Sequence, residues 1–374
     1  MPTIPSQRNA RELRPDVLRN EIVEYVDQME RIEVGEDRYA SALTEFPLVN
    51  LDHPEEEWYV MDGVRAPMKG ASYSSESPVG TLDMPDKDDV TVQAYKKKYR
   101  PDKGAETEFT QTPFSLYMRA AAVLRTEIFL TREQITWRGD EHVHGLTGQF
   151  GDEPNEEIPD DHVFDSLTTW SDAVNSTPYT DLLDAAYEVR NNGVFFGQAE
   201  PTVYAPPSVL RDVKRSDDME DRLAGVELRS VTTGDVQRLV DEEIGQIKTV
   251  LVYVPRTDAD GNYLDENNEE VDHADEAAQD NVLEPYNPAT DSVVRNVIIG
   301  RPGSGSAYIP WFSERLLERA TNAPDPGEIS VDTANGFFTQ TWNDHDPITP
   351  NFKAAQEIGF KIQRGDNWAI IHDI

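Results

Sequence analysis

TPFSLYMRAAAVLRTEIFLTREQITWRG, from Thr112 to Gly139, is the stretch of sequence that decides the fold. Thr112 is a good N-cap, Pro113 suits the first helical position, and Gly139 can end a helix. The pattern predicts one helix over residues 113–138, roughly 39 Å long at about 1.5 Å per residue, and such a length indicates a spine. Its apolar face comprises Phe114, Tyr117, Met118, Ala121, Leu124, Ile128 and Ile135, and the interrupting arginines are Arg119, Arg125, Arg132 and Arg138.

The chain before this helix divides into an arm and an extended excursion. Residues 8–33 repeat apolar side chains at three- and four-residue steps, which predicts a mostly helical arm with a basic first half. Residues 46–100 contain short β-rich runs, such as Trp58–Met61 and Val90–Tyr95, and an exposed connection over residues 73–85. This excursion has little core of its own, so we expect a neighbouring molecule to supply its missing burial.

The chain after the spine predicts a compact α/β region. A loop-rich acidic linker, residues 141–164, comes first. The strongest strand signal is the continuous run Thr249–Val254, which is typical of a strand buried on both faces. Further helices are predicted over residues 179–191, 208–223 (N-capped by Ser208) and 234–247, and further strands over residues 201–205, 291–299, 306–309, 336–342, 353–363 and 368–371.

Composition excludes several classes of protein. The chain of 374 residues has 71 acidic and 34 basic side chains, a net charge of −37, and 9% aromatic residues, which is too many for a disordered acidic tail. The absence of cysteine excludes disulfides and thiolate zinc sites. No apolar run is long enough to span a membrane, and the polar stretch Met1–Glu12 predicts no secretory signal. The acidity argues against binding nucleic acid through a broad basic surface.

The acidity also indicates an environment of high salt. Only ten of the basic residues are lysines, and the acidic residues are spread along the whole chain. A charge of −37 makes a compact protein repel itself in dilute buffer, whereas at molar salt the Debye length falls to about 3 Å. The composition therefore favours a protein from a salt-loaded cytoplasm, with an ordinary acidic mesophile protein as the alternative.

Residues 256–291 form an acidic insertion with twelve carboxylates and one arginine. Asp258, Asp260 and Asn262 resemble the start of a calcium loop and are weak candidates for metal ligands. Such a loop needs glycine at its sixth position, where this chain has Tyr263, so a polar hairpin tip is the favoured interpretation. The insertion shows no apolar period, and we expect that it buries nothing and is dispensable for the fold of the subunit.

The remaining motifs give no catalytic constellation. The glycine-rich run Gly300–Ser306 lacks the Gly-Lys-Ser/Thr ending of a phosphate loop and reads as a tight turn. His142 and His144 share one side of an extended segment but have no third ligand at a recognisable spacing. His345 has no apparent nucleophile partner. We therefore expect neither an enzyme nor a bound cofactor.

Several stretches together resemble a known family. They are the spine Thr112–Gly139, Trp170–Asp172 followed by the helix at 178–190, the strand and helix of Pro201–Leu210, and the closing strands Gly336–Trp342, Ile358–Ile362 and Trp368–Ile371. Their order, from helical arm through β excursion and spine to a compact α/β lobe, resembles the major capsid proteins of tailed double-stranded DNA viruses. The resemblance covers nearly the whole chain and implies the Hong Kong 97-type capsid fold, an α+β architecture. The composition resembles that of viruses of halophilic archaea.

The resemblance gives each part of the chain an expected role. It implies an N-terminal arm over residues 1–48, an extended loop (E-loop) over 49–108, a peripheral domain from 109–210 and 326–374 with spine helix 113–138, and an axial domain over 211–325 with the insertion 256–291. The implied function is self-assembly, through pentamers and hexamers, into an icosahedral shell around viral DNA that it contacts without sequence specificity. The implied partners are portal, scaffold and decoration or turret proteins. The location would be the virion capsid, assembled in the host cytoplasm and away from membranes.

Two other functions remain open from the sequence. One is the shell of an encapsulin-like nanocompartment with the same fold, and the other is a halophilic α/β enzyme that uses carboxylates and a divalent metal. For the shell, Lys96, Lys97, Lys98 and Arg100 are the predicted interface. They cluster in a chain that otherwise avoids lysine, so we expect them to contact an acidic patch on an adjacent subunit.

Overall fold

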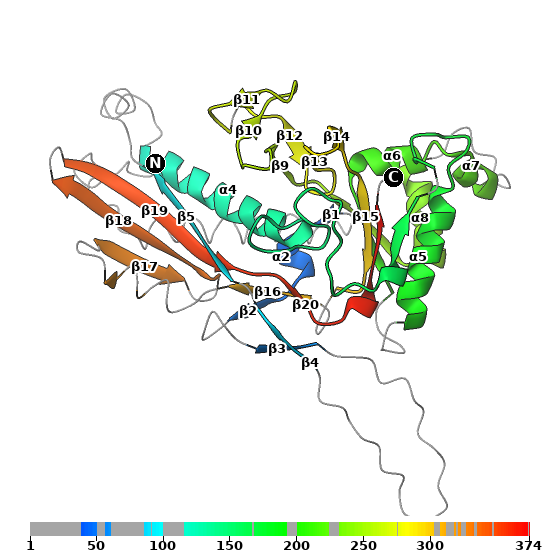
Figure 1. Ribbon diagram of the computed structural model, residues 1–374, viewed down its shortest axis with the longest axis horizontal. Helices are drawn as coiled ribbons and strands as arrows, with labels where there is room; N and C mark the ends of the chain where they lie inside the picture. Colours follow the sequence, from blue (N-terminus) through cyan, green and yellow to red (C-terminus); the bar gives the residue numbers. More distant parts are fainter. Residues whose placement is uncertain are drawn as a thin grey trace, which may run out of the picture.

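The computed structural model describes residues 39–50, 57–60, 86–90, 92–99, 116–166, 168–192, 200–223, 232–274, 276–302, 307–311, 318, 321–322, 327–332, 335–345, 348–372 and 374. The predictions for the arm at residues 8–33, the connection at 73–85, the helix start at Thr112 and Pro113, and Arg100 fall outside these ranges. Within them, the chain forms two large sheets joined by a long helix (Figure 1), and four two-stranded sheets. No described helix combines the length and the apolarity that crossing a membrane requires.

The joining helix, α4 (Leu116–Trp137), confirms the predicted spine. It ends because Gly139 has a φ of 81°, a left-handed value that glycine adopts without strain. The Gly139 N–H donates to the Gln134 carbonyl at 2.9 Å, and a Cβ at this position would lie 2.2 Å from the Val143 carbonyl oxygen. Only glycine therefore fits the turn that stops the spine.

One end of the molecule is a six-stranded mixed sheet in the order β1-β8-β7-β15-β21-β6. Its strands are β1 (Tyr39–Ala40), β6 (Val163–Asp165), β7 (Thr202–Ala205), β8 (Gln246–Val250), β15 (Asn296–Gly300) and β21 (Trp368–His372). The helices on one face are α5 (Pro178–Asn192), α6 (Pro207–Val213), α7 (Asp217–Leu223) and α8 (Thr233–Glu243). Val297 and Ile299 pack among these helices, whereas Ile298 packs into the core on the opposite face. Both faces of this sheet are therefore buried.

The other end is a seven-stranded sheet in the order β17-β18-β19-β16-β2, with β5 paired to β19 and β20 paired to β16. Its strands are β2 (Leu48–Asn50), β5 (Gln93–Tyr99), β16 (Ala307–Trp311), β17 (Glu328–Asp332), β18 (Phe337–His345), β19 (Ile348–Ile358) and β20 (Lys361–Ile362). The α4 helix covers one face, where Leu124 and Ile128 pack with Phe352. A ribbon of β3 (Glu57–Val60) and β4 (Asp86–Asp89) pairs with none of the other described strands.

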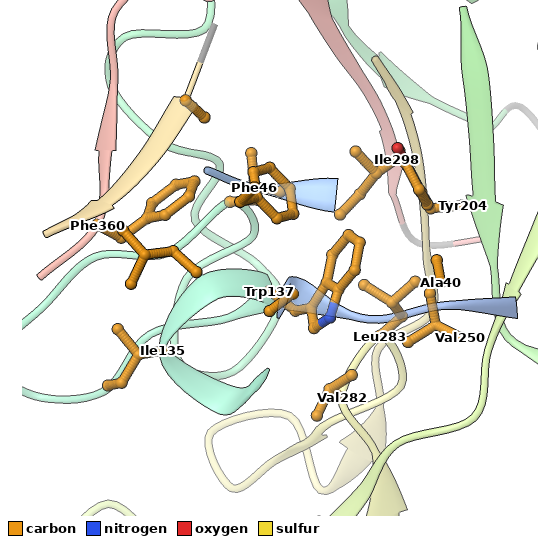
Figure 2. Packing of buried hydrophobic residues seen from close by; sticks show 14 of the residues in the cluster. Ala40, Phe46, Ile135, Trp137, Tyr204, Val250, Val282, Leu283, Ile298 and Phe360 are labelled. Carbon is orange, nitrogen blue, oxygen red and sulfur yellow. The ribbon is translucent and has the colours of Figure 1, made fainter. Parts of the chain in front are cut away.

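Aromatic side chains close the core where the spine meets the six-stranded sheet (Figure 2). The Trp137 ring lies edge-on to Phe46, with 5.4 Å between the ring centres. Glu133 is 0% exposed, and its carboxylate accepts the Ala42 N–H at 2.8 Å and the Trp137 indole N–H at 2.8 Å. These bonds satisfy a buried carboxylate and tie the short helix α2 (Ala42–Glu45) to the spine.

The acidic insertion is more than a solvated loop, and the expectation that it buries nothing is wrong. It consists of hairpins formed by β9 (Tyr253–Pro255) with β12 (Gln279–Asn281), β10 (Tyr263–Leu264) with β11 (Glu270–Val271), and β13 (Tyr286–Asn287) with β14 (Ser292–Val293). Val282 and Leu283 are both 0% exposed and belong to the same core as Trp137. Two adjacent apolar residues create no period, and so the sequence pattern did not reveal them.

The run from Thr249 to Val254 is not the single buried strand that its composition predicts. The β8 strand ends at Val250, β9 begins at Tyr253, and Leu251 and Tyr253 are 47% and 44% exposed. The run divides because its two halves pair with different partners, β8 with β7 and β1, and β9 with β12. The β-propensity of the run correctly predicted extended backbone. It could not show where the chain passes from the six-stranded sheet to the pair of β9 and β12.

Two helix predictions also need correction. Residues 208–223 form two helices, because Ser216 accepts the Met219 N–H and begins α7 as an N-cap. Ser208 lies inside α6, whose N-cap is Pro206, and its hydroxyl donates to Glu284 instead of capping. The helix predicted over 234–247 ends early, at Glu243, since Ile247 belongs to β8. The helix at 179–191 and the strands at 201–205 and 368–371 are confirmed within one residue at each end.

Candidate functional site

The lysines predicted as an interface lie on β5, at the edge of the seven-stranded sheet. Lys96, Lys97 and Lys98 are consecutive and exposed. The β5 strand pairs antiparallel with β19, where Lys98 lies opposite Lys353, and it pairs with no other strand that the structure describes. Such an edge offers unpaired backbone groups to a partner, and lysines there discourage indiscriminate strand pairing.

Every second side chain of β5 turns toward the spine. The Tyr95 hydroxyl donates to the Asp140 carboxylate at 2.6 Å, and the Tyr99 hydroxyl donates to Glu127 at 2.6 Å. Burial raises the pKa of both tyrosines, and the accepting carboxylates raise it further, so both hydroxyls remain donors at neutral pH. Lys97 lies 3.5 Å from the same Glu127 oxygen. These contacts fasten β5 to α4 and engage Lys97 within its own chain.

The alternate side chains form a second group, which we call the lysine face: Lys96, Lys98 and Lys353. The Lys98 amine lies 4.8 Å from the centre of the Trp342 ring, and the Lys353 amine lies 5.4 Å from that of Phe338. Burial lowers the pKa of Lys353, and the nearby charge of Lys96 lowers it further. The structure therefore divides the predicted lysine trio between two opposite faces of the sheet.

A groove of about 370 Å³ runs between β5, the spine and the acidic insertion. Its walls include Tyr95 and Lys96 from β5, Glu127 from α4, Val254 from β9 and Tyr263 from the insertion. Figure 1 shows α4 between the seven-stranded sheet and the hairpins of the insertion. The insertion therefore lies on the spine side of the sheet, opposite the face on which Lys98 and Lys353 contact Trp342 and Phe338.

Arg132 is a residue whose role sequence reasoning missed, because it appeared only as an interruption of the apolar stripe. It is 1% exposed, its Nε–H donates to the Gln356 side-chain oxygen at 3.1 Å, and another guanidinium N–H donates to the Asn335 carbonyl. Its guanidinium lies 5.0 Å from the centre of the Trp311 ring. Burial lowers its pKa to about 10, which leaves it charged at neutral pH. Its position four residues after Ile128, on the same face of the helix, was the available signal.

The weak metal candidates occupy a hairpin tip, as the favoured interpretation predicts. The Asp258 carboxylate accepts the N–H groups of Asp260 and Asn262 at 2.9 and 2.8 Å, and the Asn262 side chain donates to it at 3.0 Å. These bonds shape a turn. Among the described residues, no three His, Asp or Glu side chains are grouped as metal ligands.

The other singled-out residues have the following surroundings. The His142 ring is 2.9 Å from Glu141, and the His144 ring is 2.7 Å from the Glu153 carbonyl oxygen. Gly300 ends β15, where a Cβ would lie 2.1 Å from the Trp368 ring, so this glycine permits a close approach of ring and backbone. His345 is the last residue of β18 and pairs with Ile348 in the turn to β19.

No protein-family model matches the chain, and no curated protein matches its sequence. Solved structures match over most of its length. A phage-related protein from Bordetella bronchiseptica is 11% identical, with 89% of this chain and 91% of that chain covered and a TM-score of 0.51. The capsid of cyanophage P-SCSP1u is 10% identical, with 90% and 88% covered and a TM-score of 0.50. An encapsulin complex from Synechococcus elongatus is 10% identical, with 89% and 86% covered and a TM-score of 0.44.

The likenesses to the phage-related protein and the cyanophage capsid establish the fold. The chain has the Hong Kong 97-type capsid fold, with α and β elements arranged around a long spine helix, and the predicted fold class is confirmed. At identities of 10–11%, the comparisons assign no role to individual residues.

Proposed function

We propose that this chain is the major capsid protein of a tailed double-stranded DNA virus and assembles into an icosahedral shell around the genome. The observation that carries the proposal is the fold, a long spine between two sheets in the arrangement of the Hong Kong 97-type capsid proteins. In this proposal the arm is residues 1–48, the E-loop 49–108, the peripheral domain 109–210 with 326–374, and the axial domain 211–325.

Incomplete pairing of strands supports assembly with copies of the same chain. The ribbon of β3 and β4 pairs with no other described strand, and a two-stranded ribbon is at best marginally stable alone in water. The β5 edge is likewise unpaired on its outer side within the described residues. Both features gain burial or hydrogen bonds when a neighbouring subunit lies against them.

The proposal includes a biological setting. Pentamers and hexamers of the chain form the shell, portal, scaffold and decoration or turret proteins complete it, and the packaged DNA is contacted without sequence specificity. Assembly takes place in the host cytoplasm, and the finished location is the virion. The chain has a structural role and no catalytic one.

The composition favours a virus that infects halophilic archaea. The net charge of −37 on each subunit makes close packing unfavourable, and packing around polyanionic DNA even more so, unless ions screen or bridge the carboxylates. We expect dialysis of particles into dilute buffer with a chelator to dissociate them or release their DNA. Light scattering measures the decrease in intact particles. Particles that stay intact for days in that buffer would contradict the halophilic setting.

The contents of purified particles test the proposed function. Particles made at molar salt from infected or expressing cells are treated with nuclease and then opened. Protected double-stranded DNA is the expected result. An enzyme cargo without DNA would instead favour a nanocompartment shell of the same fold, and a metal-dependent hydrolytic activity from single chains would favour an enzyme.

A further inference from the structure

The lysine face carries positive charge that its own chain does not neutralise. Lys98 and Lys353 lie directly opposite each other in the antiparallel pair of β5 and β19, and like charges in such pairs are destabilising. Lys96 lies two residues along on the same face, close enough to depress the pKa of the half-buried Lys353. A surface with this arrangement is stabilised by an anion that approaches from outside.

Three other lysines that the structure describes are paired with carboxylates, unlike the amines of the lysine face. Lys248 lies 2.5 Å from Glu45, Lys361 lies 2.9 Å from Glu157, and Lys97 lies 3.5 Å from Glu127. In the part of the chain that the structure describes, no carboxylate lies within 4 Å of an amine of the lysine face, although the protein has 71 acidic residues. The neighbours of Lys98 and Lys353 are aromatic rings instead.

A dense group of exposed carboxylates lies on the spine side of the sheet. It is the hairpin of β10 and β11, which carries the exposed residues Glu266, Glu269, Glu270 and Asp272. Tyr263 at its base lines the groove beside Glu127, on the spine side of the sheet. Lys96 also lines this groove, whereas Lys98 and Lys353 lie beside Trp342 and Phe338 on the opposite face of the sheet. A hairpin from another copy could approach that opposite face from outside.

The hairpin has a fixed shape before any partner binds. The Asp265 carboxylate accepts the N–H groups of Asn267 and Glu269 at 2.8 and 2.9 Å, which holds the turn between the two strands. The turn is also held by Arg256, whose guanidinium donates to the Asn268 side-chain oxygen at 2.7 Å. Glu266 and Glu269 are thus presented on a preorganised tip, which lowers the entropy cost of docking.

We propose that the lysine face binds the acidic β10–β11 hairpin of a second copy of this chain, and that this contact sets the register between neighbouring subunits. The inference rests on the proposed shell function and names one of its contacts. A DNA backbone fits less well, since duplex DNA presents a phosphate every 1.7 Å or so of its axis and is tracked by long stripes of cations. The lysine face offers three amines on a chain of net charge −37.

A charge-swap series tests the contact through the yield of sedimentable shells at molar salt. We expect the double variant Lys96→Glu with Lys98→Glu to reduce the yield about tenfold, and Glu266→Lys with Glu269→Lys to do the same. Both pairs combined in one chain should restore the yield to within about twofold, because the two swapped surfaces again attract. Circular dichroism of each variant checks that the subunit is folded.

Matched neutral variants separate the two faces of β5. Lys96→Gln with Lys98→Gln should lower the yield, whereas Lys97→Gln, on the same strand but facing the spine, should not. An equal loss from Lys97→Gln, or the absence of rescue in the combined charge swap, overturns the proposal. Lysine-face variants that form normal shells but lose protected DNA would make DNA the occupant and also overturn it.

Cross-linking identifies the occupant directly, because the chain has no cysteine of its own. Chains with Lys98→Cys and differently tagged chains with Glu269→Cys are co-assembled and treated with a short dimaleimide. We expect a mixed dimer in shells and none in dissociated subunits. Shells without the mixed cross-link refute the hairpin contact while leaving the shell function intact. Wild-type chains that never form shells refute the shell function itself.

Discussion

The C-terminal end of the spine and the β5 edge satisfy their charges in opposite ways. At the spine end, Glu133 and Arg132 are buried, and both find partners within the chain. At the edge, Lys96 and Lys98 are exposed and have aromatic or aliphatic neighbours instead of carboxylates among the described residues. The first region is complete in one molecule, whereas we propose that the second gains stability from another copy. The contrast indicates which surfaces fold the subunit and which are left for assembly.

The largest expected effect belongs to the spine end. Trp137→Ala removes a ring that is 0% exposed and leaves the Glu133 carboxylate without its indole donor. We expect a loss of about 3–5 kcal/mol in the free energy of unfolding, as for other buried aromatic truncations. Urea unfolding of the dissociated subunit in high salt measures it. The control is Trp342→Ala, because that ring is only half-buried, and an equal loss there would erase the contrast.

The acidic insertion contains the same contrast on a smaller scale. Leu283→Ala should cost about 2–5 kcal/mol, since this side chain is 0% exposed in the main core. Replacing Glu266–Glu269 by an Asn-Gly turn should cost about 1 kcal/mol or less, because the tip buries little. Thermal unfolding of both variants compares them. If the tip replacement were the more damaging of the two, it would be wrong that Leu283 anchors the insertion while the exposed turn contributes little stability.

The tyrosine that fastens β5 to the spine should have an intermediate effect. Tyr99→Phe removes the hydrogen bond to Glu127, and we expect a loss of about 1 kcal/mol, since Glu127 keeps Lys97 as a partner. A double-mutant cycle with Glu127→Ala isolates the coupling between the two side chains. A coupling energy near zero would show that the hydroxyl bond does not hold the strand.

The smallest effects distinguish the two faces of β5 by sign. Lys98→Gln relieves the repulsion from Lys353, so we expect subunit stability to stay the same or rise by up to about 0.5 kcal/mol. Lys97→Gln breaks an exposed ion pair with Glu127 and should lower stability by about 0.2–1 kcal/mol. Low-salt melting curves give the best resolution, because screening weakens both effects. Equal signs for the two variants would refute the assignment of the two faces.

The sequence predicted those parts of the fold that depend on local chemistry. The spine ends where Gly139 allows it, and the helix at α5 and the strand at β21 follow from their apolar patterns. The division of the run Thr249–Val254 between two sheets depends on distant partners, and so local propensity could not show it.

The sequence predicted that the lysines cluster, but not how their side chains are distributed over the two faces of the sheet. Three consecutive lysines in a lysine-poor chain marked β5, yet their separation into two faces required knowing that the segment is a strand. Lys353 joins the lysine face from more than 250 positions away through the register of β5 and β19. Arg132 was hidden because a buried arginine and a solvated one look alike in a helical pattern.

Electron microscopy of the purified chain at molar salt tests the central claim most directly. The account predicts closed icosahedral shells of uniform size that disappear when the salt is removed. A uniform population of single chains or small oligomers, at every salt concentration and protein concentration tried, would contradict it.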